Sequence, residues 1–130
     1  MALSVEDQLE IQQLYSRYNH AIDFGDADGW AACFTADGLF NGGTGGSQSG
    51  TEALKGFATA FAARMQGKAR HWNTNLVVEG TDSGARGKCY LMLMNLKDKP
   101  AAPMVTAVYH DELARTADGW KFTSRAVQGD

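Results

Sequence analysis

Apolar residues near the start of the chain recur every three or four positions, which is the spacing of one face of an α-helix. Polar residues occupy the positions between them, so one face of this helix is predicted to be buried. We predict that the helix runs from about Val5 to Phe24 and stops at Gly25, with Ser4 and Asp7 forming a capping box at its start. Its apolar face consists of Ile11, Leu14, Tyr15, Tyr18, Ala21 and Ile22.

Two further helices are predicted from the same spacing. The segment 26–34 predicts a short second helix, and a turn then leads into a short strand at residues 39–40. A capping box of Ser49 and Glu52 predicts the start of a third helix, which ends at Gly67. The apolar face of this third helix consists of Ala53, Leu54, Phe57, Phe61 and Met65.

The segment 41–50 separates the short strand from the third helix and holds five glycines together with small polar residues. Such a composition does not pack a core, so it predicts a mobile loop, and the sequence does not show whether this loop acts as a lid. Neither of the glycine spacings that are typical of phosphate-binding loops occurs in it.

After Gly67 the apolar period changes from 3.6 to 2, which predicts strands. Four strands are predicted, at residues 69–79, 86–96, 104–115 and 120–127. The dipeptide Asp118-Gly119 favours a two-residue hairpin turn between the last two. Helices that precede a run of antiparallel strands are typical of the α+β class, and we predict one domain that covers residues 1–130.

Large residues occupy both faces of the second of these strands. The helices can cover only one face of the sheet, so the other face is expected to meet a second copy of the chain. We therefore predict a homodimer or a higher homo-oligomer. The two faces carry Cys89, Leu91 and Leu93 on one side and Tyr90, Met92 and Met94 on the other.

The composition argues against several classes of function. The formal net charge is −3 and no run of Lys or Arg occurs, so the sequence predicts no binding to nucleic acid or to an anionic membrane surface. No apolar run approaches the roughly 18 residues that are needed to cross a bilayer, and the first residues do not resemble a secretory signal. We expect a cytoplasmic protein.

The cysteines and histidines show no metal-binding pattern. Cys33 and Cys89 lie far apart and are expected to be buried free thiols. His20, His71 and His110 are too scattered to share a metal on one element. The sequence therefore supports no metal and no cofactor.

His71 is the histidine whose surroundings suggest chemistry. In a regular strand it would share a face with Ala69, Asn73 and Asn75, opposite a face with Arg70, Trp72, Thr74 and Leu76. Polar groups that face a sheet's covering helices need partners, and a substrate cavity would supply them. The alternative is a half-buried histidine that is hydrogen-bonded to a neighbour.

A carboxylate that accepts the second N–H of an imidazole makes it a better general base, and Asp23 is the candidate for this role. It ends the first helix, where the helix dipole disfavours an unpartnered carboxylate. Tyr18 lies five positions earlier, about 140° away around an ideal helix, so the two side chains converge only if the helix end unwinds or tilts. Tyr18 is otherwise a core or rim aromatic residue.

Three stretches of the chain resemble one family. They are Ile11 to Asp23, Arg70-His71-Trp72-Asn73-Thr74-Asn75, and Asp111 to Arg125 with its Gly119-Trp120-Lys121-Phe122 segment. In their order and spacing they resemble the SnoaL-like branch of the NTF2-like superfamily. The resemblance implies a cone-shaped α+β fold, in which three N-terminal helices pack on a strongly curved antiparallel sheet around a deep pocket.

Within this superfamily the chain is most similar to the cofactor-independent lyases scytalone dehydratase, hexachlorocyclohexane dehydrochlorinase and bile-acid 7α-dehydratase. Their Asp–His pair falls on Asp23 and His71, and the tyrosine of the bile-acid enzyme falls on Tyr18. The dehydrochlorinase has a lysine at that position, so Tyr18 argues against halide elimination. An arginine of the family's pocket falls on Arg125.

The resemblance implies an elimination or isomerisation of a lipophilic cyclic small molecule. His71 would remove a proton next to a carbonyl group, Asp23 would hold the ring, and Tyr18 would donate a hydrogen bond to the developing oxyanion. Arg125 would bind an anionic group. By strand alternation we further expect the pocket wall to include Asn73, Tyr90, Met92 and Tyr109, for each of which core packing is the alternative.

Two other functions fit the same sequence. The first is a non-catalytic module that binds a small apolar ligand, with His71 serving only a structural role. The second is an assembly subunit of the kind found as the small subunit of ring-hydroxylating dioxygenases. The distance between the Asp23 carboxylate and the His71 ring discriminates these readings from the lyase.

Overall fold

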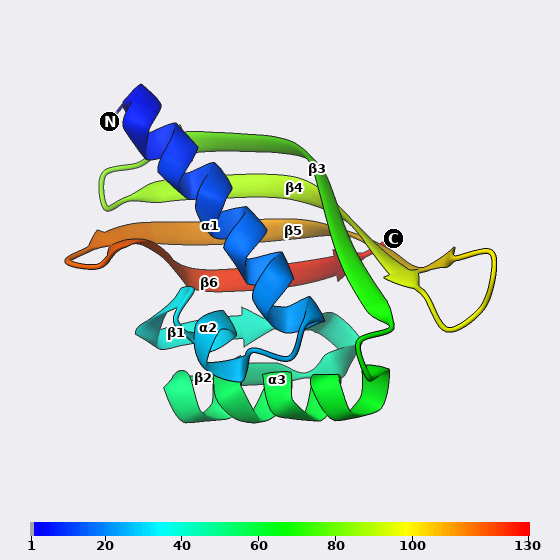
Figure 1. Cartoon of the computed structure of the whole chain (residues 1–130). Coiled ribbons are helices and arrows are strands. Elements are labelled where there is room, and N and C mark those ends of the chain that lie inside the picture. The colour runs from blue at the N-terminus through cyan, green and yellow to red at the C-terminus, as the bar shows by residue number, and fades with distance from the viewer. Residues whose placement is uncertain (1) are drawn as a thin grey trace.

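The computed structural model describes residues 2–130, which form three α-helices, a 3₁₀ turn and six strands (Figure 1). The elements follow in the order α1 (Val5–Asp23), α2 (Ala27–Ala31), β1 (Phe34–Asn41), η1 (Gly43–Gly45), β2 (Ser47–Ser49), α3 (Thr51–Met65), β3 (Ala69–Gly80), β4 (Ala85–Asn95), β5 (Ala102–Thr116) and β6 (Gly119–Gly129). The predicted α+β class and the four long strands are confirmed.

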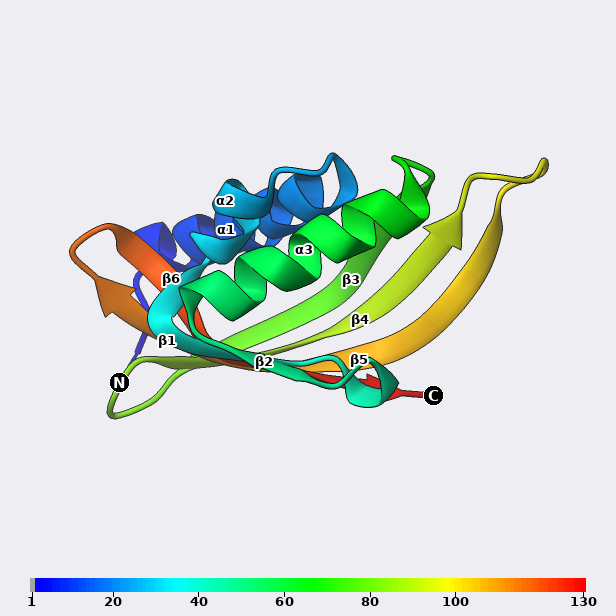
Figure 2. The ribbon, with the colours of Figure 1, turned by 90° about the horizontal axis from the view of Figure 1, so that it is seen from below.

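The six strands form one sheet in the order β2-β1-β6-β5-β4-β3. All neighbours are antiparallel except β1 and β6, which are parallel. The sheet is curved without closing into a barrel, and the three helices cover its concave face (Figure 2). Strand β3 is an edge strand, and α1 crosses the sheet so that its last turn lies near the start of β3 (Figure 1).

The glycine-rich segment 41–50 has more structure than its composition suggested. It contains η1 and β2, and β2 pairs with β1 through Leu39–Ser49, Phe40–Gln48 and Asn41–Ser47. The prediction of a mobile loop is corrected here because pairing along the sheet edge satisfies backbone groups that a composition argument leaves out. The predicted two-residue strand is accordingly the end of a longer strand, β1.

A cluster of aromatic rings fills the space beneath α1. Tyr18 is 1% exposed, and its ring centroid lies 5.5 Å from that of Trp30 and 5.7 Å from that of Phe122. Aromatic pairs at such separations stabilise a core beyond their buried area. The helical spacing seen in the sequence therefore corresponds to a buried face, as predicted.

A bulge in β3 changes which residues face the core. The register between β3 and β4 shifts between Thr74 and Val77, and Asn75 has a φ of 58°. One extra residue in a strand moves all later side chains to the opposite face. Leu76 therefore packs against the core, and the prediction that it shares a face with Trp72 is wrong.

The convex face of the sheet has no helix over it (Figure 2). Trp72 and Tyr90 are each 52% exposed, and they line a cavity of about 440 Å³ on this face together with Met92 and Thr106. The predicted one-sided cover of the sheet is thus present.

Both cysteines are buried and free, and no helix within residues 2–130 meets the length and hydropathy required to cross a bilayer.

The two capping boxes predicted from the sequence give a test of local structure. Ser4 and Asp7 form theirs, with bonds of 3.0 Å from Asp7 N–H to Ser4 Oγ and 3.2 Å from Ser4 N–H to Asp7 Oδ2. The second box does not form, because Gly50, with a φ of 87°, caps α3 without a side-chain bond. Ser49 lies in β2 instead.

We expect Ser4→Ala to lower the free energy of unfolding by about 1 kcal/mol, the usual cost of removing an N-cap hydroxyl. The matched change Ser49→Ala should leave it nearly unaltered. Urea unfolding followed by circular dichroism measures both. Equal losses in the two variants would contradict the assignment of Gly50 as the cap of α3.

Candidate active site

Asp23 and His71 form a close pair between the end of α1 and the start of β3. Asp23 Oδ1 lies 2.5 Å from His71 Nδ1, and Asp23 Oδ2 accepts the backbone N–H of His71 at 3.0 Å. The two side chains are 5% and 8% exposed. Both carboxylate oxygens therefore engage one residue, which fixes the position of the imidazole ring.

The carboxylate also determines which ring nitrogen is free. A carboxylate accepts hydrogen bonds, so Nδ1 carries the proton and Nε2 has a lone pair in the neutral ring. No hydrogen bond to Nε2 is formed within residues 2–130. One face of the ring packs near Phe61, with centroids 5.6 Å apart. The arrangement is that of a general base held ready to accept a proton.

Asp23 and His71 line a cavity of about 310 Å³, at the lower end of the range for small-molecule sites. It lies between the second half of α1 and the first residues of the edge strand β3. The residues that line it are Ser16, Asn19, His20, Asp23, Phe24, Arg70, His71 and Trp72.

Tyr18 is not among the residues that line this cavity. The helix remains regular to Asp23 and ends with the Asp26 N–H bonded to the Ala21 carbonyl at 2.9 Å around Gly25, whose φ is 78°. Because the helix end does not unwind, Tyr18 and Asp23 stay on different sides of α1. Burial raises the pKa of Tyr18, so its hydroxyl is neutral within the core.

Arg125 is held in the core by Asp111. Its Nε and Nη2 donate to the two oxygens of Asp111, both at 2.8 Å, and Tyr15 donates its hydroxyl to Asp111 Oδ2 at 2.5 Å. Burial by itself would lower the pKa of Arg125, but the Asp111 carboxylate raises it well above its usual value. Arg125 is 0% exposed. Its guanidinium is therefore engaged with protein groups instead of facing the dyad cavity.

Aromatic rings complete the surroundings of this guanidinium. The Arg125 Cζ lies 3.8 Å from the centroid of Tyr109, 4.3 Å from that of Phe122 and 4.4 Å from that of Tyr18. Such contacts stabilise a desolvated cation. Tyr109 is therefore a core residue, and the prediction that it lines the pocket wall is wrong. The third nitrogen of the guanidinium, Arg125 Nη1, has no hydrogen-bond partner among the described residues.

The other three residues expected in the pocket wall differ in where they lie. Asn73 does not line the dyad cavity but lines a neighbouring cavity of about 390 Å³, where it accepts a hydrogen bond from Asn19 Nδ2 at 2.9 Å. Tyr90 and Met92 lie on the convex face, away from Asp23 and His71. That expectation is corrected, because the alternation of a strand with large residues on both sides does not tell which side faces inward.

Asp111, Asn19 and Arg70 were missed as candidates by reasoning from the sequence. Asp111 pairs directly with Arg125 in the β5–β6 register, but only because the register shifts between Glu112 and Leu113. A regular hairpin continued from the turn would place Asp111 opposite Ser124, so the turn signal could not have found this pair. Asn19 and Arg70 carry no signal either. Their place beside the dyad depends on how α1 crosses β3.

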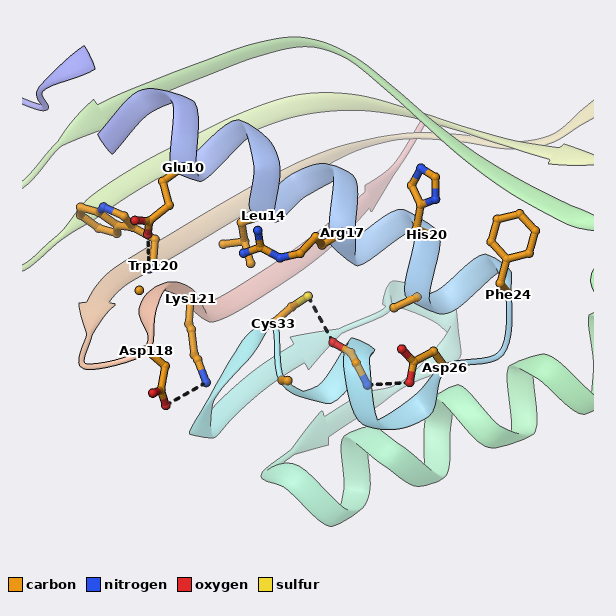
Figure 3. A pocket seen from close by; sticks show the side chains of 14 residues that line it. Glu10, Leu14, Arg17, His20, Phe24, Asp26, Cys33, Asp118, Trp120 and Lys121 are labelled. Carbon is orange, nitrogen blue, oxygen red and sulfur yellow. Dashed lines mark hydrogen bonds and ion pairs between the residues drawn. The ribbon is translucent and has the colours of Figure 1, made fainter. Parts of the chain in front are cut away.

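A larger cavity, about 1000 Å³, lies elsewhere, between α1, α2 and the hairpin of β5 and β6 (Figure 3). Its carboxylates are already engaged: Glu10 accepts the Trp120 N–H at 2.6 Å and Asp26 accepts the Gly29 N–H at 2.9 Å. Its third carboxylate, Asp118, forms an ion pair with Lys121 at 4.0 Å, and the Asp118 side chain is 85% exposed. Within residues 2–130 none of these carboxylates is bonded to a histidine ring, so size alone does not make this cavity the candidate active site. Among residues 2–130 no group of three His, Cys, Asp or Glu side chains is placed to hold a metal ion.

The sequence and the fold identify the class of protein. Residues 3–126 match the SnoaL-like domain family, and the chain belongs to this family. A solved NTF2-like protein with a cystatin-like fold from Novosphingobium aromaticivorans shares the fold at a TM-score of 0.87, with 21% identity over 95% of this chain and 81% of that one. The NTF2-like fold inferred from the sequence is thus confirmed.

Two more similar solved structures carry further information. A putative aromatic ring hydroxylase from Novosphingobium aromaticivorans is 32% identical over 98% of this chain and 91% of its own, with a TM-score of 0.81. A protein from Catenulispora acidiphila in complex with S-DNPA is 27% identical over 98% and 96%, with a TM-score of 0.85. A comparison with curated proteins gave no match.

The buried ion pair predicts a large effect on stability. Arg125→Met should lower the free energy of unfolding by about 3–5 kcal/mol, because it leaves the Asp111 carboxylate buried without its cation. Thermal unfolding measures the loss.

Arg86→Met provides the matched control. Arg86 bonds Glu112, the residue after Asp111, at 3.0 Å, but both side chains are about half exposed. Its removal should leave the unfolding midpoint nearly unchanged. The double variant Arg125→Met, Asp111→Leu should recover part of the loss. If Arg125→Met and Arg86→Met have the same unfolding midpoint, the Arg125–Asp111 ion pair does not stabilise this part of the core.

Proposed function

We propose that the protein is a cofactor-independent lyase, a dehydratase in particular, or an isomerase, and that it acts on a lipophilic cyclic small molecule. The observation that carries the proposal is the double engagement of His71 by Asp23, with one carboxylate oxygen on the ring N–H and the other on the backbone N–H. A histidine with a merely structural role needs only one such partner.

The proposed reaction begins with proton abstraction. Nε2 of His71 removes a proton from a carbon next to a carbonyl group, and the electron pair of the C–H bond moves into the enolate. The Asp23 carboxylate stabilises the imidazolium that forms. In an elimination the enolate then expels a β-hydroxyl group, which takes the proton and leaves as water. In an isomerisation the imidazolium returns the proton to a different carbon.

The family supports this class of reaction, because SnoaL-like proteins are often cofactor-free isomerases or cyclases. The Catenulispora relative, in complex with S-DNPA, supports the binding of a small molecule. The description of the Novosphingobium relative as a putative aromatic ring hydroxylase names a different reaction, an oxidation. Similarity to scytalone dehydratase and the bile-acid 7α-dehydratase is the finer form of the proposal, and it rests on the positions of Asp23 and His71.

The expected roles of Tyr18 and Arg125 change with their positions. Both lie in the aromatic core, where the Arg125 Cζ is 4.4 Å from the Tyr18 ring. We assign them to holding α1 on the sheet, and with it Asp23, instead of to contact with the reacting atoms. Asn73, bonded through Asn19 to α1, remains a candidate for contact with substrate.

The experiment that tests the proposal uses a β-hydroxytetralone, which becomes a fluorescent naphthol when it loses water. His71→Ala and Asp23→Asn should each lower kcat by about a hundredfold or more while the circular dichroism spectrum stays the same. The control is His110→Ala, which removes an exposed histidine bonded to Gln128 on the other face. A screen of cyclic hydroxy-ketones in the same assay extends the test to other ring systems.

Two results would sink the proposal. One is turnover near the wild-type rate in either variant of the pair. The other is the absence of turnover in the wild-type protein together with ligand binding that does not depend on His71, which would favour the non-catalytic binding module.

The exposed convex face supports a homodimer as part of this proposal. Trp72, Tyr90 and Met92 form a contiguous apolar surface with the cavity beside them, and a surface of this kind is typical of an interface between subunits. The same surface would serve an assembly subunit of the dioxygenase type.

We expect Tyr90→Lys to shift the mass measured by light scattering from that of a dimer to that of a monomer, because it places a charge in the centre of this surface. Leu9→Lys is the control, since Leu9 is an exposed apolar residue on α1. A wild-type mass of 14.0 kDa would show a monomer and remove the basis of the dimer.

A further inference from the structure

Arg70 carries a positive charge that is fixed in place without an acidic partner. Its Nη1 donates to the carbonyl oxygens of Gly67 at 3.2 Å and Ala69 at 2.9 Å. Its Cζ lies 4.6 Å from the centroid of the Phe24 ring. In the part of the chain from residue 2 onward, no carboxylate lies within 4.0 Å of it. The N–H groups of Nε and Nη2 therefore remain to bind another molecule.

Arg70 is one of the residues that line the cavity of the Asp23–His71 pair. Phe24 and Trp72, which are 64% and 52% exposed, line the same cavity and offer flat apolar surfaces. Figure 3 shows the Phe24 and His20 side chains at the end of α1, pointing away from the floor of the larger groove around Cys33. Aromatic surfaces and a held cation thus occur side by side.

Arg70 is the group in this cavity that is placed to bind an anion. Asp23 is the acidic residue in its lining, and both of its oxygens are engaged by His71. The planar fork of an arginine matches a carboxylate group. Arg125, which the sequence suggested for this role, is neutralised by Asp111.

We propose that the substrate of this site is an aromatic carboxylate whose acid group binds Arg70 and whose ring lies against Phe24 and Trp72. The inference rests on the proposed function, because it concerns the same cavity. The cavity volume of about 310 Å³ suits one ring or two fused rings.

Isothermal titration calorimetry with β-naphthoate and its neutral counterpart β-naphthamide tests the inference on the complete chain. The wild-type protein should bind the naphthoate about tenfold more tightly, since a hydrogen bond to a charged group contributes roughly 1.5 kcal/mol or more. Arg70→Gln should remove this preference and leave the affinity for the naphthamide unchanged. Arg70→Lys should retain part of it.

Arg64→Gln is the matched control. The Arg64 Cζ also lies over an aromatic ring, 5.4 Å from the Phe61 centroid, but Arg64 lines none of the cavities described above. The control should keep the full preference. The indole N–H signal of Trp72, assigned with Trp72→Phe, should shift in NMR spectra when the naphthoate binds.

Equal affinity for the two probes in the wild-type protein would overturn the inference, whether or not Arg70→Gln folds. So would a preference that survives in Arg70→Gln or is lost equally in Arg64→Gln. His71→Ala should still prefer the naphthoate, because the preference does not depend on turnover. Loss of turnover in the Asp23 and His71 variants without any carboxylate preference would therefore refute this inference alone, and preference without turnover would refute the proposed reaction.

Discussion

The position of α1 on the sheet depends on the buried ion pair between Arg125 and Asp111. The pair joins β6 to β5, and the Tyr15 hydroxyl attaches the middle of α1 to the same carboxylate. Buried charges are costly unless they are paired, so this arrangement tolerates few alternatives. Among the described residues Arg125 Nη1 alone of the guanidinium nitrogens has no hydrogen-bond partner. The aromatic rings around the guanidinium complete its shielding from water. Because the middle of α1 is held there, the end of the helix is carried to β3.

The Asp23–His71 pair is the second attachment of α1 to the sheet. A regular helix ending at Asp23 places this side chain over the edge strand, and the curvature of the sheet brings β3 up to meet it (Figure 2). The two attachments differ in their consequences. The inner one has its carboxylate engaged by an arginine and a tyrosine within the core. The outer one lies in a cavity, and its ring nitrogen Nε2 has no hydrogen-bond partner among residues 2–130. A buried inner pair thus holds in place an outer pair that lines a cavity.

The two faces of the sheet differ in what covers them. The concave face carries the core and meets the helices, while the convex face presents Trp72, Tyr90 and Met92. Trp72 lines cavities on both sides of the edge strand, the one with the dyad and the one on the convex face. An edge strand is the place in a sheet where one side chain can reach both, because no further strand covers it.

The sequence by itself determined the helix faces, the long strands, the family, and the residues of the dyad. Helical spacing placed Tyr18 in the core, and the order of the motifs indicated the family through which Asp23 was matched to His71. These properties depend on local periodicity and on short motifs. The hairpin between β5 and β6 was likewise predicted from Asp118-Gly119, although its two-residue loop is Ala117-Asp118 and Gly119 is the first residue of β6.

Only the tertiary structure decided which face of β4 points inward, where β3 bulges, and which arginine is free. The sequence does not show which of Arg125 and Arg70 is free to bind a ligand. In the structure Arg125 lies opposite Asp111 in the paired strands β5 and β6, whereas Arg70 lies on the edge strand β3 beside Phe24. Gly50 replaced Ser49 as the cap of α3 because pairing with β1 draws Ser49 into β2. In each case the outcome depends on groups that are distant in the chain, and local patterns carry no information about such partners.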